Sequence, residues 1–232
     1  MQMDTSGGRI NKVIRLNDEV VLVGLDAGIL YMFRDIYAID TKPITPRTGR
    51  LLKLFTEPPA PPARSLQAAQ NLTEGCFTWY VTKFLHTLDM PLLPLELLKA
   101  ENQSKVTFKL DGVKTVNGAQ VVMLKYTQAP TANLMRTTAG VPVTGRLSIE
   151  MPSGTLRQSE VIVSNQAMTL RATVDYTFDK TLSLWLPQEL SQRFDVSTSA
   201  AAVEQVNEHG SFETHARYTK YTQAKIDLDK IR

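Results

Sequence analysis

The segment that decides the fold runs from Ala167 to Phe178 and reads AMTLRATVDYTF. Apolar and polar residues alternate along it, and this period of two is typical of a β-strand with one face in an apolar interior and the other in water. The same period recurs in the segments 105–110, 146–151, 190–196 and 212–218. The sequence therefore predicts a sheet with one buried face.

Short turn sequences separate these segments. Asp111-Gly112, Asn117-Gly118 and Pro152-Ser153-Gly154 contain residues that accept a positive φ angle or preset a turn. We interpret them as hairpin turns, which join antiparallel neighbours. Two further strands are predicted at 12–25 and 31–39, with a turn at 26–28 between them, and residues 1–10 are expected to be frayed.

Residues 58–100 follow a different period. The proline run Pro58 to Pro62 favours an extended conformation and is interpreted as a linker or a lead-in to a helix, in preference to a motif for a proline-binding module. After it, residues recur at steps of three and four, which predicts one stripe of a helix with an aromatic face. A short second helix is predicted at 95–100. The stripe consists of Leu66, Ala69, Thr73, Phe77, Tyr80, Phe84 and Leu88.

The order of strands, helices and strands predicts a mainly β (α+β) fold. We expect one domain over residues 1–232, built on one antiparallel sheet that is curved or partly closed as an incomplete β-barrel. The helical insert at 58–100 is expected to cover the concave face of this sheet.

Composition excludes several classes of protein. The 26 Lys and Arg against 23 Asp and Glu give a formal charge of +3, and these residues are scattered, which disfavours nucleic-acid binding. Apolar runs such as Val20 to Leu25 are too short to cross a bilayer, so no transmembrane segment is expected. The single Cys76 has no partner for an internal disulfide, and residues 1–15 show no signal-peptide pattern.

Catalytic and metal-binding patterns are not apparent. His86, His209 and His215 have no serine, cysteine or carboxylate beside them in a spacing known for nucleophilic catalysis. Glu213 and His215, with His209, are metal ligands only if the loop curls back, whereas a strand places Glu213 and His215 on one polar face without a metal. We therefore predict a non-enzymatic protein with no metal and no cofactor.

An apolar lining is the remaining candidate site. The aromatic helix and the apolar side of the strand 167–178 face each other in the predicted fold, together with a tryptophan in the loop-like segment 182–187. They form either a ligand cavity or a filled core, and the pattern alone does not choose between the two. The candidate ligand-binding residues are Phe77, Tyr80, Phe84, Met168, Leu170, Val174, Tyr176 and Trp185.

Several segments carry a resemblance to a known family. YMFRDIY at 31–37 and RLLKLF at 50–55 resemble the FRDV and RLLxLF segments of a group of exported bacterial proteins without an established activity. Four further segments resemble the same group in the same order, at 145–154, 172–176, 184–187 and 216–221. The group is itself similar to the LolA/LolB-like lipoprotein carriers, in which an incomplete antiparallel barrel with a helical lid holds acyl chains.

The resemblance implies a LolA/LolB-like fold and a periplasmic or extracellular location. It also implies that the protein binds a lipid acyl chain or another hydrophobic small molecule, as an envelope carrier or sensor. The alternative is a protein–protein interaction module of the cell envelope with a filled core, which docks through the proline segment or an open sheet edge.

Overall fold

The chain divides into two compact units, which we describe separately. The large unit comprises residues 1–13 and 87–221, and the small unit comprises residues 14–86 and 222–232. The computed structural model describes residues 2–5, 12–13, 15–24, 30–44, 49–57, 63–77, 91–129, 131–132, 134, 141–165, 168–196 and 210–224.

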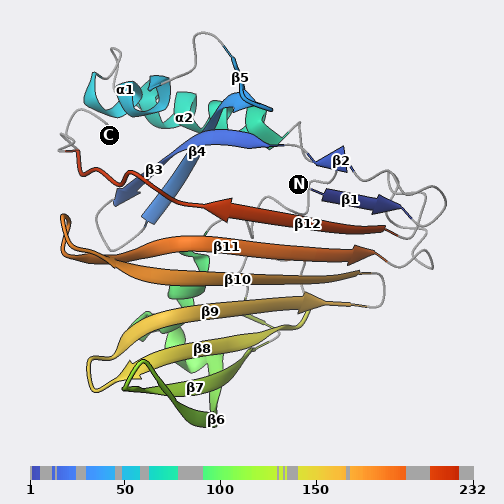
Figure 1. The fold of residues 1–232 in the computed structure, drawn as a ribbon, viewed down its shortest axis with the longest axis vertical. Helices are drawn as coiled ribbons and strands as arrows, with labels where there is room; N and C mark the ends of the chain where they lie inside the picture. Colours follow the sequence, from blue (N-terminus) through green and yellow to red (C-terminus); the bar gives the residue numbers. More distant parts are fainter. Residues whose placement is uncertain are drawn as a thin grey trace. The chain divides into compact units, whose positions relative to one another are not determined.

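Figure 1 labels the strands and the two α-helices of the two units. The small unit contains β3 (Leu16–Gly24), β4 (Leu30–Ile39), β5 (Lys42–Pro43), α1 (Arg50–Thr56) and α2 (Ala63–Phe77). The large unit contains β1 (Gln2–Thr5), β2 (Lys12–Val13), the 3-10 helices η3 (Leu93–Leu98) and η4 (Ala100–Lys105), β6 (Val106–Val116), β7 (Ala119–Gln128), β8 (Val143–Met151), β9 (Thr155–Ser164), β10 (Met168–Asp179), β11 (Leu184–Val196) and β12 (Gly210–Arg217).

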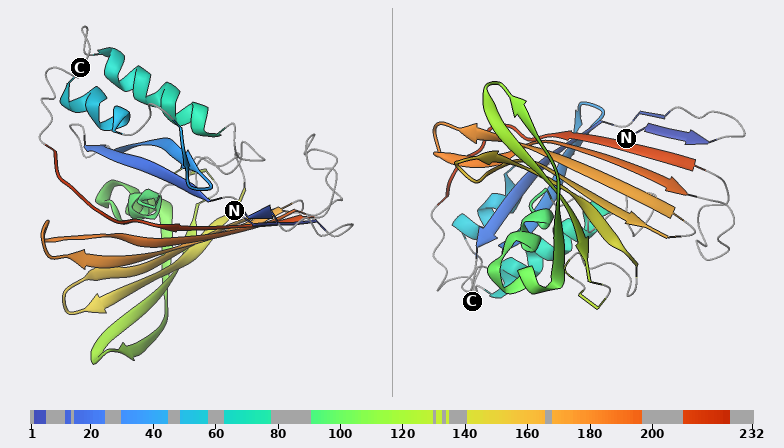
Figure 2. Two further views of the ribbon diagram at one scale, coloured as in Figure 1. Left: turned by 45° about the horizontal axis from the view of Figure 1, so that its top comes forward. Right: turned by 90° about the horizontal axis from the view of Figure 1, so that it is seen from below.

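The large unit is built on one open sheet of nine strands. Their order is β2-β1-β12-β11-β10-β9-β8-β7-β6, and every neighbouring pair is antiparallel. From β6 to β12 each strand pairs with the next in sequence; short connections join most of these pairs, whereas residues 129–142 join β7 to β8 and residues 197–209 join β11 to β12. Figure 2 shows these strands fanning out with the twist that is usual for an open sheet.

The register divides this sheet into an apolar face and a polar face. On β10, Leu170, Ala172, Val174 and Tyr176 are all buried, while the residues between them belong to the other face. The alternation in the segment 167–178 therefore predicted the two faces correctly. The paired residues extend the apolar face to Leu147 of β8 and to Val161 and Val163 of β9, all of which are buried.

Three β-bulges lie on one line across the sheet. The extra residues are Asp111 in β6, Arg157 in β9 and Gln188 in β11, each at a register shift. A bulge bends its strand and increases the local twist, so the sheet curves along this line. We call it the bulge line, and it passes through the paired residues Gly112, Met123, Ser148, Gln158, Asp175 and Glu189.

Two predicted local structures were wrong in this region. Asp111-Gly112 is not a hairpin turn: the strand continues through it as a bulge, and the Asp111 carboxylate contacts Lys125 and Arg146 on the polar face. The β6–β7 turn is at Asn117-Gly118, where both residues have positive φ angles of 51° and 81°. The segment 182–187 is not mainly a loop either, because β11 begins at Leu184.

The small unit has its own sheet, β3-β4-β5, and its own core. Ala69 of α2 is fully buried in this core, and Leu66 packs against it, so the first part of the predicted helix stripe is confirmed. The helix α1 was not predicted; Leu51 and Phe55 are its buried residues. The core consists of Val21, Val23, Phe33, Leu51, Phe55 and Ala69.

Two of the segments that resemble the family, 31–37 and 50–55, pack against each other in the small unit. Asp35 of β4 accepts two hydrogen bonds from the Arg50 guanidinium, at 2.5 and 2.9 Å, and its side chain is 1% exposed. The rings of Phe33 and Phe55 lie 5.4 Å apart between centroids. The Glu19 carboxylate of β3 accepts backbone hydrogen bonds from Leu51 and Leu52 at the start of α1. These segments therefore determine how the helix sits on its sheet.

The fold class is confirmed at the level of a mainly β protein with a large antiparallel sheet. Of the strands before the helices, β3, β4 and β5 form a second sheet, in which α1 and α2 cover the apolar face of β3 and β4, whereas β1 and β2 belong to the large sheet. Among the described residues, no helix is long and apolar enough to cross a membrane.

Candidate functional site

The structure brings together three of the predicted ligand-binding residues. Val174 and Tyr176 are buried in one cluster on the apolar face, and Trp185 packs against it. Leu170 lies on the same face and is buried. The remaining predictions fall outside the described residues: Tyr80 and Phe84 entirely, and Phe77 and Met168 in their side chains.

A hydrogen bond from Tyr176 connects the segment before η3 to the sheet. Its hydroxyl donates to the backbone carbonyl of Pro91 at 3.0 Å and lies 3.1 Å from the Ser159 hydroxyl. Because the single phenol proton is used on Pro91, Ser159 is the donor in the second bond. Burial raises the pKa of Tyr176 to about 12, so the phenol is neutral and serves as a structural group.

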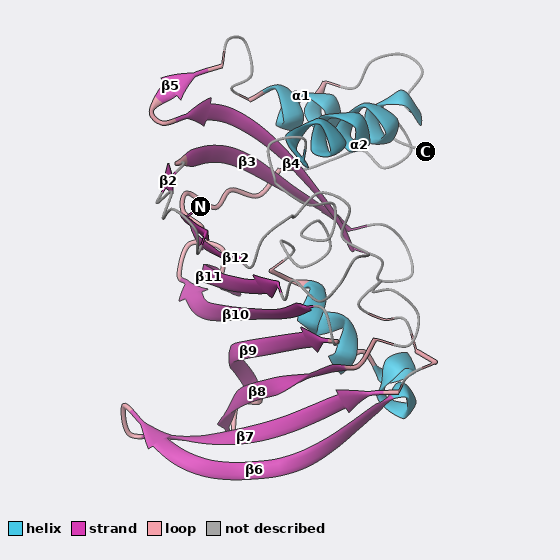
Figure 3. Ribbon diagram, turned by 90° about the vertical axis from the view of Figure 1, so that its right-hand side faces the viewer, coloured by secondary structure: helices cyan, strands magenta, loops and turns pink. Residues whose placement is uncertain are grey.

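Side chains of the same unit cover this cluster. Leu92, and Leu95 of η3, pack against the buried residues from one side, and Figure 3 shows η3 and η4 beside the strands of the large sheet. Side chains of the protein itself therefore cover Val174 and Tyr176. The cluster is formed by Ala172, Val174, Tyr176 and Leu190, with Leu92, Leu95, Leu156, Trp185, Ala216 and Tyr218 packed against it.

The apolar face continues beyond this cover and becomes exposed. Leu110 is 68% exposed, Val113 56%, Met151 46% and Phe178 45%, and the register places all four on the apolar face. The Phe178 ring lies 5.8 Å from that of Trp185, which links it to the covered cluster. We call the exposed and half-buried apolar residues of this part the apolar strip: Leu110, Val113, Val122, Leu124, Ile149, Met151 and Phe178.

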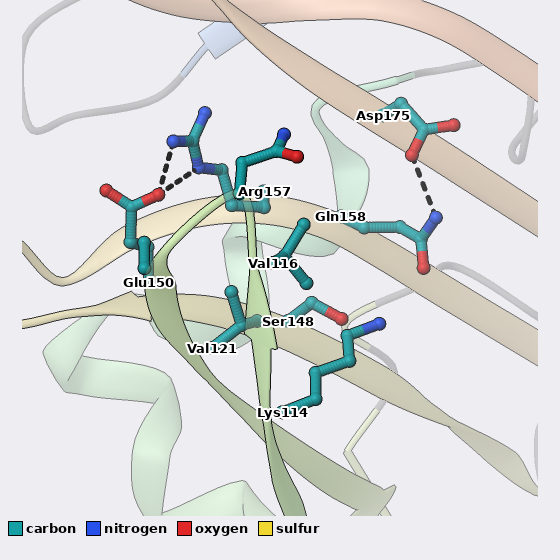
Figure 4. Close-up of a pocket in the computed structure, with 10 residues that line it drawn as sticks. Lys114, Val116, Val121, Ser148, Glu150, Arg157, Gln158 and Asp175 are labelled. Carbon is teal, nitrogen blue, oxygen red and sulfur yellow. Dashed lines mark hydrogen bonds and ion pairs between the residues drawn. The ribbon is translucent and has the colours of Figure 1, made fainter.

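A pocket opens on the opposite, polar face. It has a volume of about 470 Å³, within the range of small-molecule sites, and five adjacent strands contribute to it. It lies on the bulge line, because Ser148, Gln158 and Asp175 are cross-strand neighbours there. Figure 4 shows the lining residues: Lys114, Val116, Asn117, Ala119, Val121, Ser148, Glu150, Arg157, Gln158 and Asp175.

Arg157 connects the two faces. Its guanidinium bonds to the Glu150 carboxylate in the pocket, with Nε at 2.7 Å, and its Cζ lies 4.1 Å from the centre of the Trp185 ring. Such cation–π contacts stabilise an arginine that is partly removed from water. The bulge at Arg157 thus directs a charged side chain toward the pocket while Leu156 packs with the apolar cluster.

Metal chemistry finds no support in the described part of the chain. No group of three His, Cys, Asp or Glu side chains there is arranged to hold a metal ion. His215 lies with its Nδ1 3.1 Å from the Ser191 hydroxyl, its cross-strand neighbour. His86 and His209 lie outside the described residues.

Sequence reasoning missed the polar pocket. Its charged residues come from four strands and have no fixed spacing in the chain, so only the register brings them together. The available signal was the polar side of the alternating segments, which includes Asp175 and Glu150. Comparison of this chain with protein-family models, with curated proteins and with solved structures finds no match.

Proposed function

We propose that the large unit binds a lipid acyl chain or another hydrophobic small molecule, without catalysis, as an extracytoplasmic carrier or sensor of the cell envelope. The observation that supports this proposal is the apolar strip, where large side chains remain exposed on the same sheet face that is buried elsewhere. Contiguous exposed apolar surface is typical of sites for ligands, membranes or proteins. The LolA/LolB-like resemblance adds the envelope location and the acyl ligand to this proposal.

Binding on this surface is expected to depend on hydrocarbon length. Each methylene buried against the strip contributes about 0.8 kcal/mol, or about fourfold in affinity, until the surface is filled. Titration with fluorescent fatty acids of increasing length measures this dependence. Absence of saturable uptake at every length contradicts the proposal.

Exposed residues allow the site to be tested without unfolding the protein. The double variant Leu110→Ser, Val113→Ser removes the two most exposed members of the strip and is expected to weaken fatty-acid uptake by about tenfold or more. Leu184→Ser is the matched control, because Leu184 is 52% exposed but belongs to the polar face by register. Equal uptake by both variants would place the ligand elsewhere and contradict the assignment to the strip.

A protein–protein interaction module is the second candidate. It is favoured by the filled cluster around Tyr176 and by β6, an edge strand of eleven residues whose outer side is unpaired among the described strands. An open edge is a template for adding a strand from another protein. Protection of the β6 amides from hydrogen exchange by a purified envelope protein, without any fatty-acid uptake, would support this module over the carrier.

A further inference from the structure

Many of the charged side chains on the polar face form ion pairs. Cross-strand ion pairs connect Asp111 with Lys125 and Arg146, Glu160 with Arg146 and Arg171, Glu189 with Arg217, and Arg193 with Glu213, and Arg193 also pairs with Asp195 of its own strand. Opposite charges on neighbouring strands attract one another, so this arrangement stabilises the register. Lys109, Lys114, Asp175 and Asp179 of this face form no ion pair with the described residues, and of these four only Lys114 and Asp175 line the pocket.

Two opposite charges without an ion pair line the pocket. The Asp175 carboxylate accepts one hydrogen bond, from the neutral amide of Gln158 at 2.8 Å, and the Lys114 ammonium has no ion pair within the described residues. Asp179 also lacks an ion pair on this face, but it accepts two backbone N–H groups of its own turn, at 2.8 and 2.9 Å. The Glu150 charge is balanced by Arg157.

The topology separates the two unpaired charges. Lys114 is on β6 and Asp175 is on β10, with β7, β8 and β9 between them. Four strand spacings of about 4.8 Å are too far for direct contact across a flat sheet. Both residues nevertheless line one pocket, where Figure 4 shows the Ser148 and Gln158 side chains between their strands.

The orientation of the Gln158 amide suits a ligand ammonium at the Asp175 end of the pocket. Its NH₂ group donates to Asp175, so its carbonyl oxygen remains an acceptor. Asp175 and this oxygen together suit a ligand ammonium, while Lys114 suits a carboxylate or phosphate. Val116, Ala119 and Val121 offer an apolar lining for the part between the two charges.

We propose that this pocket binds a small zwitterion with an ammonium group at one end and an acidic group at the other, of the size of a dipeptide or an ω-amino acid. Asp175 and Gln158 hold the ammonium, and Lys114 holds the acidic group. The site is on the opposite face from the apolar strip, so it goes beyond the hydrophobic-ligand function and does not depend on it.

The experiment uses dialanine and two capped forms as probes. N-acetyl-dialanine lacks the ammonium, and dialanine amide lacks the carboxylate. Amide chemical shifts of the full-length protein report binding at the pocket residues during each titration. Dialanine is expected to bind with saturation and both capped forms about tenfold or more weakly, since one charge-assisted hydrogen bond is lost in each.

Two variants test which residue binds the ammonium group of the ligand and which binds its acidic group. In Asp175→Asn, dialanine and N-acetyl-dialanine are expected to bind equally; in Lys114→Gln, dialanine and dialanine amide are expected to bind equally. Lys109→Gln is the control, because Lys109 is on the polar side of the same strand but outside the pocket, and it should retain the discrimination. All three variants change half-buried or exposed side chains, and thermal melts verify that they fold.

The outcomes decide the proposal. Lack of saturable shifts with dialanine and with 6-aminohexanoic acid overturns it, as does binding without discrimination between free and capped ends. Discrimination that survives in both pocket variants also overturns it. The Leu110→Ser, Val113→Ser variant should bind dialanine normally. Dialanine binding and fatty-acid uptake are measured separately, so each of the two proposals can be contradicted without the other.

Discussion

The small unit and the polar face of the large sheet use the same kinds of ion pair in opposite surroundings. The Asp35 side chain, which holds Arg50, is 1% exposed, whereas Glu189 and Arg217 are 45% and 74% exposed. Water screens the exposed pair, while the buried carboxylate depends on its partner because it has lost its hydration. The comparison indicates that a buried ion pair contributes strongly to the stability of the fold. An exposed charge contributes little to stability and can still bind another molecule.

The largest effect is expected from breaking the buried pair. Asp35→Ala leaves the partly buried Arg50 guanidinium without its carboxylate and should destabilise the small unit by about 3 to 5 kcal/mol. Chemical denaturation followed by near-UV circular dichroism measures the loss. The double variant Asp35→Leu, Arg50→Met removes both charges and should recover part of the stability. A loss below about 1 kcal/mol for Asp35→Ala would contradict the comparison.

A packing change in the large sheet is expected to come next. A Cβ atom at Gly145 would lie 1.9 Å from the backbone oxygen of Glu160 and 2.5 Å from the Tyr126 hydroxyl, so Gly145→Ala must displace β9 or the tyrosine. We expect destabilisation by about 3 kcal/mol, at the upper end of overpacking effects.

The matched control for this change is Gly112→Ala. There the nearest atom to a new Cβ is the flexible end of the Met123 side chain, at 3.2 Å, which moves easily. Its effect should stay below about 1 kcal/mol. Similar losses in the two variants would show that contact at Gly145 is relieved more easily than the geometry indicates.

A smaller, pH-dependent effect is expected at Glu19. Burial raises the pKa of this carboxyl above its usual value, so the folded state binds the proton more tightly than the unfolded chain. Stability of the small unit should therefore decrease as the pH rises from the usual glutamate pKa through the raised one. Denaturation at several pH values measures the slope, and Glu19→Gln should abolish it. An unchanged slope in Glu19→Gln would assign the effect to another group.

The smallest effect is expected for the exposed pair. Arg217→Ala removes the ion pair with Glu189 and should change stability by less than about 1 kcal/mol, decreasing further in high salt. The same denaturation assay applies. A loss comparable to that of Asp35→Ala would remove the distinction between the two regions.

The sequence predicted those features that depend on neighbours in the chain. The alternation around Val174 and Tyr176 identified the buried face, and Asn117-Gly118 identified a hairpin turn, since both follow from local geometry. The bulge at Asp111-Gly112 was misread as a turn, because the same residue types suit both structures. Bulges depend on the partner strand, which local patterns do not reveal.

The candidate site was less predictable than the fold. Trp185 and Tyr176, which the sequence suggested as parts of one lining, belong to one cluster, but the covering residues Leu92 and Leu95 were not predicted. The opposed charges of Lys114 and Asp175 carry no signal in the chain, because they are 61 positions apart and line the same pocket only through the register of five strands.

The bulge line also constrains how this protein can vary by insertion and deletion. Each bulge is one extra residue between positions that otherwise alternate, so removing Arg157 alone would leave Gln158 on the polar face and Leu156 on the apolar face. Removing a single residue elsewhere in the strand would move part of the strand to the opposite face. Gaps within the strands of related chains should accordingly gather at positions 111, 157 and 188.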